Sequence, residues 1–573
     1  MPTGAAALLD RLASWKSRFG PPETGELERL LERAAHTRFR DPALLARLHE
    51  TALFLRAYPR TAAVAGIADR ILASMESRVA VLRRAGCDLS MLEEPEISGI
   101  AGTAFSAVFS YEVARRLCAR NPKLEIDWEA YDRQDRLGPV ARRFIPLLDE
   151  DWPVEAHAPF QCWVNAARPR GRGGLAYLLE RIGALPLAER ERADLFESLE
   201  LPLRLEFSAT PRTRSQLALE RRALHFHKQP LIARRQVSLA EALAAPPLAI
   251  RRVPPREAGR VLDLILDTSA MRYRELYGFS HPDVDRVFHT DIGRGVEIYF
   301  FGVPREWRLP LRAYHSAMFF KNGIPGGYVE VLSIFERAEV GFNLYYTFRE
   351  GESAWLYAQL LRLFRQTLGV TTFSVDPYQI GHENEEAIES GAFWFYRKLG
   401  FRPADPQIAR LTEAEERRLS GSPGLRSSPR TLRKLAAGYI LYDAEGGEKS
   451  EWDRFQVRNL GLAVARATAA RHGGDPLRMQ AWARGRLAEA LGAAPDCPLA
   501  LVASLIPGLN RWSDAEKSAL LSILRAKNSA DESRYLRLMQ RHARFRAACL
   551  KSGSAPPNET AAANIRSAFE TAY

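Results

Sequence analysis

The chain has 573 residues, a net charge of +12, 46% hydrophobic residues and 26% charged residues. This length exceeds one ordinary hydrophobic core and indicates about two to four domains. The composition is typical of a globular protein in water. The sequence contains no run of about 18 apolar residues, so no membrane-spanning helix is predicted. The five cysteines are scattered, which excludes a disulfide framework and a zinc-type spacing and favours a cytoplasmic location.

The positive net charge favours anionic partners, which include phosphorylated cofactors and nucleic acid. The basic residues do not form one long block, so charge spread over solvated helix faces is the favoured interpretation. Nucleic acid is therefore an alternative partner that only the net charge supports.

Residues 1–240 are predicted to form a mostly α-helical N-terminal region, because apolar residues recur at helical spacing. The helical pattern covers residues 44–58, 65–86 and 104–120. Residues 201–207 and 221–232 have the pattern of two short strands near the end of this region.

Residues 246–405 change character, with aromatic and β-branched runs that predict strands. Asn322-Gly323 is a strong hairpin signal between two of them. The predicted strands are 248–253, 295–303, 314–323, 326–335, 340–348 and 371–377, and the predicted helices are 256–279, 353–369 and 391–400. This order predicts a central mixed sheet with helices on its faces.

A Gly/Ser/Pro linker is expected at residues 420–430, followed by an α-helical C-terminal region over residues 431–573. The fold class predicted for the whole chain is therefore a multidomain α+β and α/β protein, with a central mixed-sheet domain between two largely helical regions.

The stretch GAFWFYRKLGF at residues 391–401 predicts a helix that ends at Gly400. With the order of elements before it, it resembles the last helix of the GNAT superfamily of acyl-CoA-dependent N-acyltransferases. That family's usual pattern is an Asn, an Ala three residues on, a Tyr four further, and then Gly-Phe. Ala392, Tyr396, Gly400 and Phe401 fall at those spacings, and Glu389 stands at the Asn position.

A second similarity follows the predicted strand 340–348, where the family places a [Gln/Arg]-x-x-Gly-x-[Gly/Ala] loop that opens a helix. Arg349 and Ala354 match its ends, Gly351 is one residue early, and Glu352 stands at the family's glycine position. A helix N-terminus suits pyrophosphate, so we expect the Glu352 carboxylate to face away from the loop or to weaken the site. The resemblance implies that acetyl-CoA or another acyl-CoA, with no metal, contacts Tyr345, Tyr346, Arg349, Gly351, Glu352, Ser353, Ala354, Glu389 and Ala392.

Acyl transfer from a thioester to an amine needs a base for the amine, donors for the oxyanion and a proton for the leaving thiolate. The family resemblance implies the last role for Tyr396, and a buried core tyrosine is the alternative. The base is expected to be Glu339, at the start of the predicted strand 340–348, where the resemblance implies a catalytic Glu, or Glu330, which shares a strand face with Tyr328. A solvated strand-edge carboxylate is the alternative for each.

The amine acceptor, a small molecule or a protein, is expected to contact the helix around residues 271–283 and the sheet face, at Arg272, Tyr273, Tyr277 and Tyr328. An ordinary half-buried amphipathic helix is the alternative at these positions. The expected function is an N-acyltransferase that moves an acyl group, with acetyl as the first expectation, from CoA to an amine. The alternative is a catalytically degenerate scaffold of the same fold that binds a protein or a nucleic acid.

Overall fold

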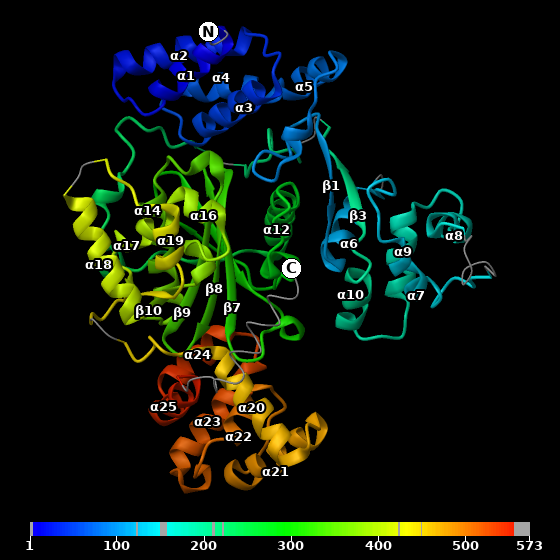
Figure 1. The fold of residues 1–573 in the computed structure, drawn as a ribbon, viewed down its shortest axis with the longest axis vertical. Helices are drawn as coiled ribbons and strands as arrows, with labels where there is room; N and C mark the ends of the chain where they lie inside the picture. The colour runs from blue at the N-terminus through cyan, green and yellow to red at the C-terminus, as the bar shows by residue number, and fades with distance from the viewer. Residues whose placement is uncertain are drawn as a thin grey trace.

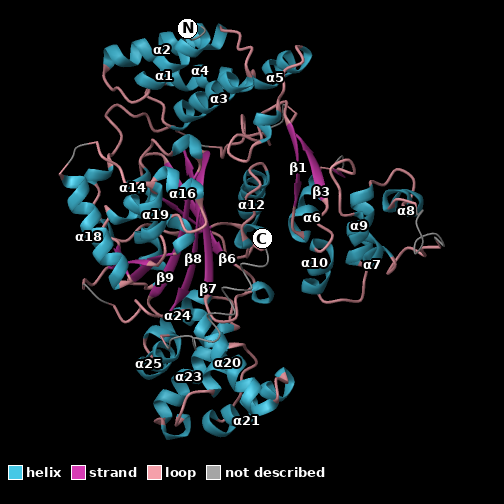
Figure 2. Ribbon diagram, viewed as in Figure 1, coloured by secondary structure: helices cyan, strands magenta, loops and turns pink. Residues whose placement is uncertain are grey.

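The computed structural model describes residues 4–121, 124–148, 158–208, 212–220, 223–421, 424–447 and 450–554. Figure 1 shows four parts: a helical layer at the N-terminus, a large central sheet with its helices, a small lobe beside the sheet, and a helical bundle at the C-terminal end. Figure 2 shows that the strands gather in the central sheet and in the small lobe. Within the described ranges, none of the helices combines the length and apolar character needed to cross a membrane.

The N-terminal layer consists of five helices that share a leucine-rich core, including Leu12, Leu31 and Leu48. They are α1 (Gly4–Trp15), α2 (Pro21–His36), α3 (Pro42–Ala57), α4 (Ala62–Ala73) and α5 (Met75–Arg84). The helix predicted over 44–58 is confirmed by α3, which begins after an Asp41 side chain that accepts a hydrogen bond from the Ala43 amide at 2.7 Å. The helix predicted over 65–86 is divided into α4 and α5 at Ser74.

The small lobe has a three-stranded antiparallel sheet in the order β1-β3-β2, covered by short helices. Its elements are β1 (Ala104–Val108), α6 (Tyr111–Arg120), β2 (Glu125–Ile126), α7 (Leu137–Ala141), α8 (Phe160–Ala167), α9 (Gly174–Gly183), α10 (Glu189–Glu197) and β3 (Pro202–Glu206). The strand predicted over 201–207 is confirmed, but the helix predicted over 104–120 is wrong in its first half. Residues 104–108 are extended because they pair with β3, which is distant in the sequence.

The described part of the strand predicted over 221–232 is irregular, so this prediction is wrong there. The segment is fixed by tertiary contacts instead, since the His227 amide donates to the Pro59 carbonyl at 2.8 Å and the His225 amide donates to Asn322 Oδ1 at 2.8 Å. The short helix α11 (Leu239–Ala244) follows and leads into the central sheet.

The central sheet has nine strands in the order β4-β5-β6-β7-β8-β9-β10-β12-β11. They are β4 (Arg251–Arg252), β5 (Phe288–Asp291), β6 (Val296–Gly302), β7 (Ala313–Lys321), β8 (Ile324–Ile334), β9 (Arg337–Leu344), β10 (Thr372–Val375), β11 (Arg402–Pro403) and β12 (Ile440–Asp443). The predicted mixed sheet is confirmed, and the Asn322-Gly323 hairpin joins β7 to β8 with both residues at positive φ.

Helices cover both faces of this sheet (Figure 1). They are α12 (Pro255–Ala270), α13 (Tyr277–Ser280), α14 (Ser353–Leu368), α15 (Pro377–Ile380), α16 (Glu385–Ser390), α17 (Ala392–Arg397), α18 (Pro406–Ser420) and α19 (Pro429–Leu435). The helix predicted over 256–279 is interrupted between Ala270 and Tyr277, where Tyr273 adopts a φ of 51°. The helix predicted over 353–369 is confirmed, with Gly369 in the left-handed conformation at its end.

Two features of strand order set the geometry of the sheet. β9 and β10 pair in parallel, whereas the other pairs of described strands are antiparallel. β12 inserts between β10 and β11, so the sheet takes a strand from beyond the boundary expected at residue 405.

The C-terminal bundle packs below the central sheet and contains α20 (Val457–His472), α21 (Pro476–Leu491), α22 (Leu499–Ser504), α23 (Asp514–Lys527), α24 (Glu532–Gln540) and α25 (Ala543–Gly553). Its contact with the sheet is specific: the buried Tyr535 hydroxyl donates to the Leu311 carbonyl at 2.7 Å, and Gln540 Nε2 donates to the Phe335 and Leu368 carbonyls at 2.9 Å. The remainder of the predicted C-terminal region, residues 555–573, lies outside the described residues.

Candidate functional site

A gap opens in the central sheet between β9 and β10. The register of β9 with β8 continues to Leu344, whereas its register with β10 ends at Glu339 opposite Ser374. A Cβ on Gly341 would lie 3.8 Å from Gln379 Nε2, so the Gln379 side chain borders the gap. The β10 side of residues 340–344 therefore leaves backbone donors and acceptors that no described strand pairs.

The two faces of the sheet beside this gap carry different side chains. Cross-strand pairing and alternation place Tyr328, Glu330 and Glu339 on one face, and Phe342 on the other. Phe342 meets Tyr357 of α14 with ring centroids 5.1 Å apart, so α14 covers the second face.

Tyr396 lies on the α14 side of the sheet. Its ring is 5.4 Å from that of Tyr357 and 5.7 Å from that of Phe401. The side chain is buried, and this burial raises the pKa of the Tyr396 hydroxyl, which keeps it protonated at neutral pH. The structure therefore places the predicted proton donor on the opposite face from Glu330 and Glu339, across the gap.

Glu330 forms a partly buried hydrogen-bonded pair with Tyr314. The Tyr314 hydroxyl donates to the Glu330 carboxylate and accepts from the Gly278 amide at 3.0 Å. Burial raises the pKa of the Glu330 carboxyl, although the hydrogen bond from Tyr314 opposes the shift. A carboxylate with a raised pKa is a stronger base than an exposed one, which suits it to accept a proton.

Glu339 has a different environment, because Arg312 Nη1 lies 3.1 Å from its Oε1. Glu339 also lines a cavity of about 230 Å³ together with Arg337, Asp376 and Tyr439. Of the two predicted bases, Glu339 is held in an ion pair and Glu330 is not paired with a cation among the described residues.

The predicted acceptor residues separate into three groups. Arg272 lies over the ring of Tyr345, with its guanidinium carbon 4.1 Å from the centroid, and Tyr328 is 6.1 Å from the same ring. Tyr277 contacts the Tyr314 ring at 5.5 Å on the Glu330 side. Tyr273 turns away toward the small lobe, where its hydroxyl donates to the Glu93 carbonyl at 2.7 Å.

A buried cationic cluster beside Tyr345 was not predicted from the sequence. Arg214 Nη2 donates to Glu50 at 2.7 Å and to Thr347 Oγ1 at 3.0 Å. Arg272 is also buried, and burial lowers the pKa of its guanidinium to about 10. Arg214 Nε and Nη1, Arg272 Nε and the Tyr345 hydroxyl have no hydrogen-bond partner among the described residues. Such unpartnered donors suit an anionic group.

The loop before α14 holds its carboxylate inward. Arg294 Nε donates to Glu352 at 2.9 Å and 3.1 Å, Lys321 Nζ lies 3.3 Å away, and the Ile232 amide donates at 3.1 Å. Burial would raise the pKa of Glu352, but Arg294 and Lys321 outweigh it and the pKa is lowered. Glu352 therefore points into the protein interior. Of the two expectations from the sequence, a carboxylate that faces away from the loop or one that weakens the site, the structure has the first.

The N-terminal layer covers one side of this loop. A Cβ on Gly351 would lie 2.5 Å from the Tyr58 hydroxyl oxygen, and Lys16 forms a 2.5 Å ion pair with Glu350. Gly351 is thus required for the close approach of Tyr58, which is a packing role.

The remaining predicted cofactor residues lie on the loop, at the start of α14 and on the helices α16 and α17. Arg349 forms an ion pair with Glu386 and lies over the exposed ring of Tyr346, 5.6 Å from its centroid. Ser353 and the buried Ala354 open α14. Exposed Glu389 lies on α16 and Ala392 on α17, and Gly391 at a φ of 67° separates these two helices, so the motif does not lie on one continuous helix.

Among the described residues, no three His, Cys, Asp or Glu side chains gather in a metal-binding arrangement. Comparisons with protein-family models, with curated proteins and with solved structures find no match for this chain.

Proposed function

We propose that the central domain is an N-acyltransferase that moves an acyl group from acyl-CoA to an amine in the gap between β9 and β10. The observation that carries the proposal is the separation of this parallel pair directly before the N-terminus of α14. The unpaired backbone of residues 340–344 can bind an extended amide-containing chain, and a helix N-terminus can bind pyrophosphate.

The residues around the gap support a specific division of roles. The amine nitrogen attacks the thioester carbonyl, and Glu330 takes the proton that the amine loses. A β9 backbone amide facing the gap stabilises the oxyanion. The C–S bond breaks, and the Tyr396 hydroxyl donates a proton to the thiolate, after which solvent returns the proton from Glu330 to Tyr396.

The acceptor class follows from the side chains near Tyr345. Arg272 supplies a buried positive charge beside the Arg214–Glu50 ion pair, and Tyr328 and Tyr345 supply aromatic surface. We expect an amine that also carries a carboxylate or a phosphate, because an anionic group would satisfy the unpartnered guanidinium donors.

Calorimetric titration of the full chain with acetyl-CoA, CoA and longer acyl-CoAs tests the donor site. Arg349→Gln is expected to weaken binding about tenfold by removing a charge at the loop. Arg433→Gln is the matched control, because Arg433 pairs with the neighbouring Glu385 at 2.8 Å but lies outside the loop. Absence of heat with every CoA species, from folded protein, would refute the donor site.

Tyr396→Phe tests the proton donor in the same protein. We expect lower turnover with unchanged acyl-CoA affinity, whereas Tyr357→Phe, which removes a buried hydroxyl 5.4 Å away by ring centroid, leaves turnover unchanged. Equal turnover of both variants and the unsubstituted protein would exclude catalysis by Tyr396.

A scaffold without catalysis is the second candidate, and the loop itself favours it. Tyr58 packs on Gly351, and Glu352 is held by Arg294 and Lys321, so part of the loop serves internal packing. CoA binding without turnover of any amine would favour this candidate over the enzyme.

A further inference from the structure

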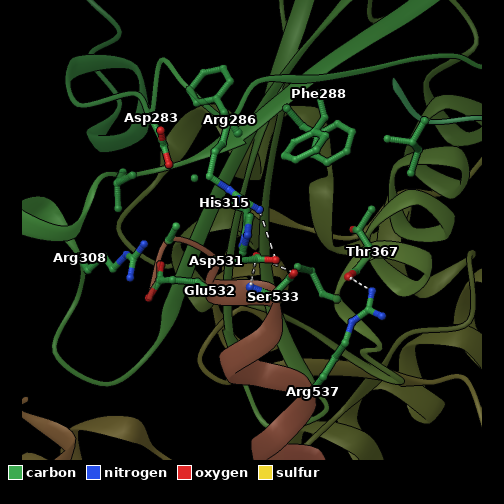
Figure 3. A pocket seen from close by; sticks show the side chains of 17 residues that line it. Asp283, Arg286, Phe288, Arg308, His315, Thr367, Asp531, Glu532, Ser533 and Arg537 are labelled. Atoms are coloured by element: carbon green, nitrogen blue, oxygen red, sulfur yellow. Dashed lines mark hydrogen bonds and ion pairs between the residues drawn. The ribbon is translucent and has the colours of Figure 1, made fainter. Parts of the chain in front are cut away.

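A second cavity, of about 290 Å³, lies between the central sheet and the C-terminal bundle (Figure 3). Strands β6 and β7, the end of α14 and the start of α24 contribute its walls. Its volume is at the lower end of the range for small-molecule sites. Thr367 and Leu368 place it at the C-terminal end of α14, which is about 24 Å long, so it is separate from the loop at the other end.

Among the described residues, two arginines at this cavity are bonded only to backbone carbonyls. Arg308 Nη1 donates to the Lys527 carbonyl at 2.8 Å and its Nε is buried without a described partner, while Arg537 Nη2 donates to the Thr367 carbonyl at 2.8 Å. No carboxylate of the described residues lies within ion-pair distance of either guanidinium. Figure 3 shows the two side chains on opposite sides of the cavity.

The other charged groups largely compensate one another. Arg286 pairs with Asp531 at 3.3 Å, and Glu532 pairs with Lys527 at 2.6 Å. Asp283 is the further carboxylate that lines the cavity. Arg308 and Arg537 against Asp283 leave an excess of positive charge, in which Arg308 is half-buried and Arg537 is exposed.

One wall of the cavity is apolar. The Phe288 and Phe300 rings stack with centroids 5.4 Å apart, and Ile250 lies beside them in the cavity wall. His315 adds a neutral polar atom, because burial lowers the pKa of its imidazole and its Nδ1 has no described partner. The cavity thus combines the half-buried guanidinium of Arg308, a hydrogen-bonding side chain and an aromatic wall.

We propose that this cavity binds a small organic carboxylate with an apolar body. The carboxylate bonds to Arg308, and the body packs against Phe288 and Phe300. A guanidinium that is already half-buried and bonded to carbonyls has donors free for a carboxylate. Because the start of α24 and strand β6 both line the cavity, the occupant lies between the C-terminal bundle and the sheet.

The test is calorimetric titration of the full chain with four probes that share one apolar body: 3-phenylpropanoate, 3-phenylpropanamide, 3-phenylpropylamine and L-phenylalanine. The carboxylate is expected to bind about tenfold tighter than the amide, and the amine is expected not to bind. Retained or tighter binding of L-phenylalanine would identify the occupant as an amino acid, with Asp283 facing its ammonium, and weaker binding would identify a plain carboxylate. Tighter binding of the amine or the amide, or no binding of any probe to folded protein, would overturn the proposal.

Variants locate the binding within the cavity. Arg308→Gln is expected to weaken 3-phenylpropanoate about tenfold, and Arg534→Gln, on the exposed side of α24, is the matched control without effect. Ile250→Trp, which fills the apolar wall, is expected to abolish binding even if Arg308→Gln fails to fold. Unchanged affinity in Ile250→Trp, or in folded Arg308→Gln, would place the ligand elsewhere and refute the site.

Discussion

Replacement of Glu352 by glutamine tests whether the inward carboxylate holds the loop before α14. Glu352 and Lys321 are both 2% exposed, so Glu352→Gln removes a buried carboxylate 3.3 Å from the buried Lys321 ammonium. Removal of one partner of a buried ion pair costs about 3–5 kcal/mol. The glutamine oxygen still accepts from the Ile232 amide, so we expect the lower value of this range.

The matched control is Glu350→Gln, two residues earlier in the same loop. Its side chain is 67% exposed and pairs with Lys16, so the expected loss is about 1 kcal/mol or less. Both variants make the same chemical change in one segment, and only the burial of the carboxylate differs.

The assay is amide hydrogen exchange of the peptide that spans residues 345–360, under conditions where exchange reports the opening equilibrium. A loss of about 3 kcal/mol accelerates exchange about 100-fold in Glu352→Gln, against about fivefold or less in Glu350→Gln. Addition of Lys321→Met to Glu352→Gln should recover part of the loss by removing the buried ammonium that had faced the carboxylate. Equal acceleration in the two glutamine variants, or no recovery in the double variant, would refute this account.

Three further predictions follow from other contacts. Burial would raise the pKa of Glu50, but the charge of Arg214 outweighs it and lowers the pKa from 4.5 to about 2. Ionised Glu50 therefore adds about 3 kcal/mol of stability that is fully present above pH 5 and is lost as the pH falls toward 2. Thermal unfolding of Glu50→Gln should thus differ most from the unsubstituted protein near pH 7, and a gap that is constant from pH 7 to pH 3 would contradict this. Tyr357→Phe should leave the urea unfolding midpoint unchanged or raised, because the buried hydroxyl has no described partner; a lower midpoint would show that the hydroxyl is bonded. Gly351→Ala should destabilise the loop by about 1–3 kcal/mol, since a Cβ meets Tyr58; unchanged hydrogen exchange of residues 345–360 would show that Tyr58 moves freely.

Local sequence patterns were sufficient for most of the central sheet. Alternating aromatic and β-branched residues predicted β6, β7 and β8, and the Asn322-Gly323 turn fixed one register. Residues 104–108 were misassigned because their strand state depends on pairing with β3, about a hundred residues later, which no local window contains. β12 escaped prediction for the same reason, since its four residues are extended only between two strands that precede it.

The sequence predicted which residues belong to the candidate site, but it predicted only some of their contacts. The spacing around Tyr396 indicated a helix end, but the left-handed Gly391 that divides α16 from α17 has no signal apart from the glycine itself. The cluster at Arg214 could not be predicted, because Glu50 and Thr347 are 297 residues apart and meet only when the N-terminal layer packs on the sheet. Contacts of this kind depend on the tertiary arrangement and leave no periodic pattern.

The insertion of β12 constrains the order in which the chain can assemble. A ribosome that has released β4 through β11 has made eight of the nine strands, yet β10 and β11 still lack the strand that joins them. The exposed edge of β10 must wait for residues 440–443, and an unpaired edge is where nascent chains aggregate. Completion of this sheet is therefore a late, long-range event, and chaperone binding to the emerging chain is expected to persist until β12 has left the exit tunnel.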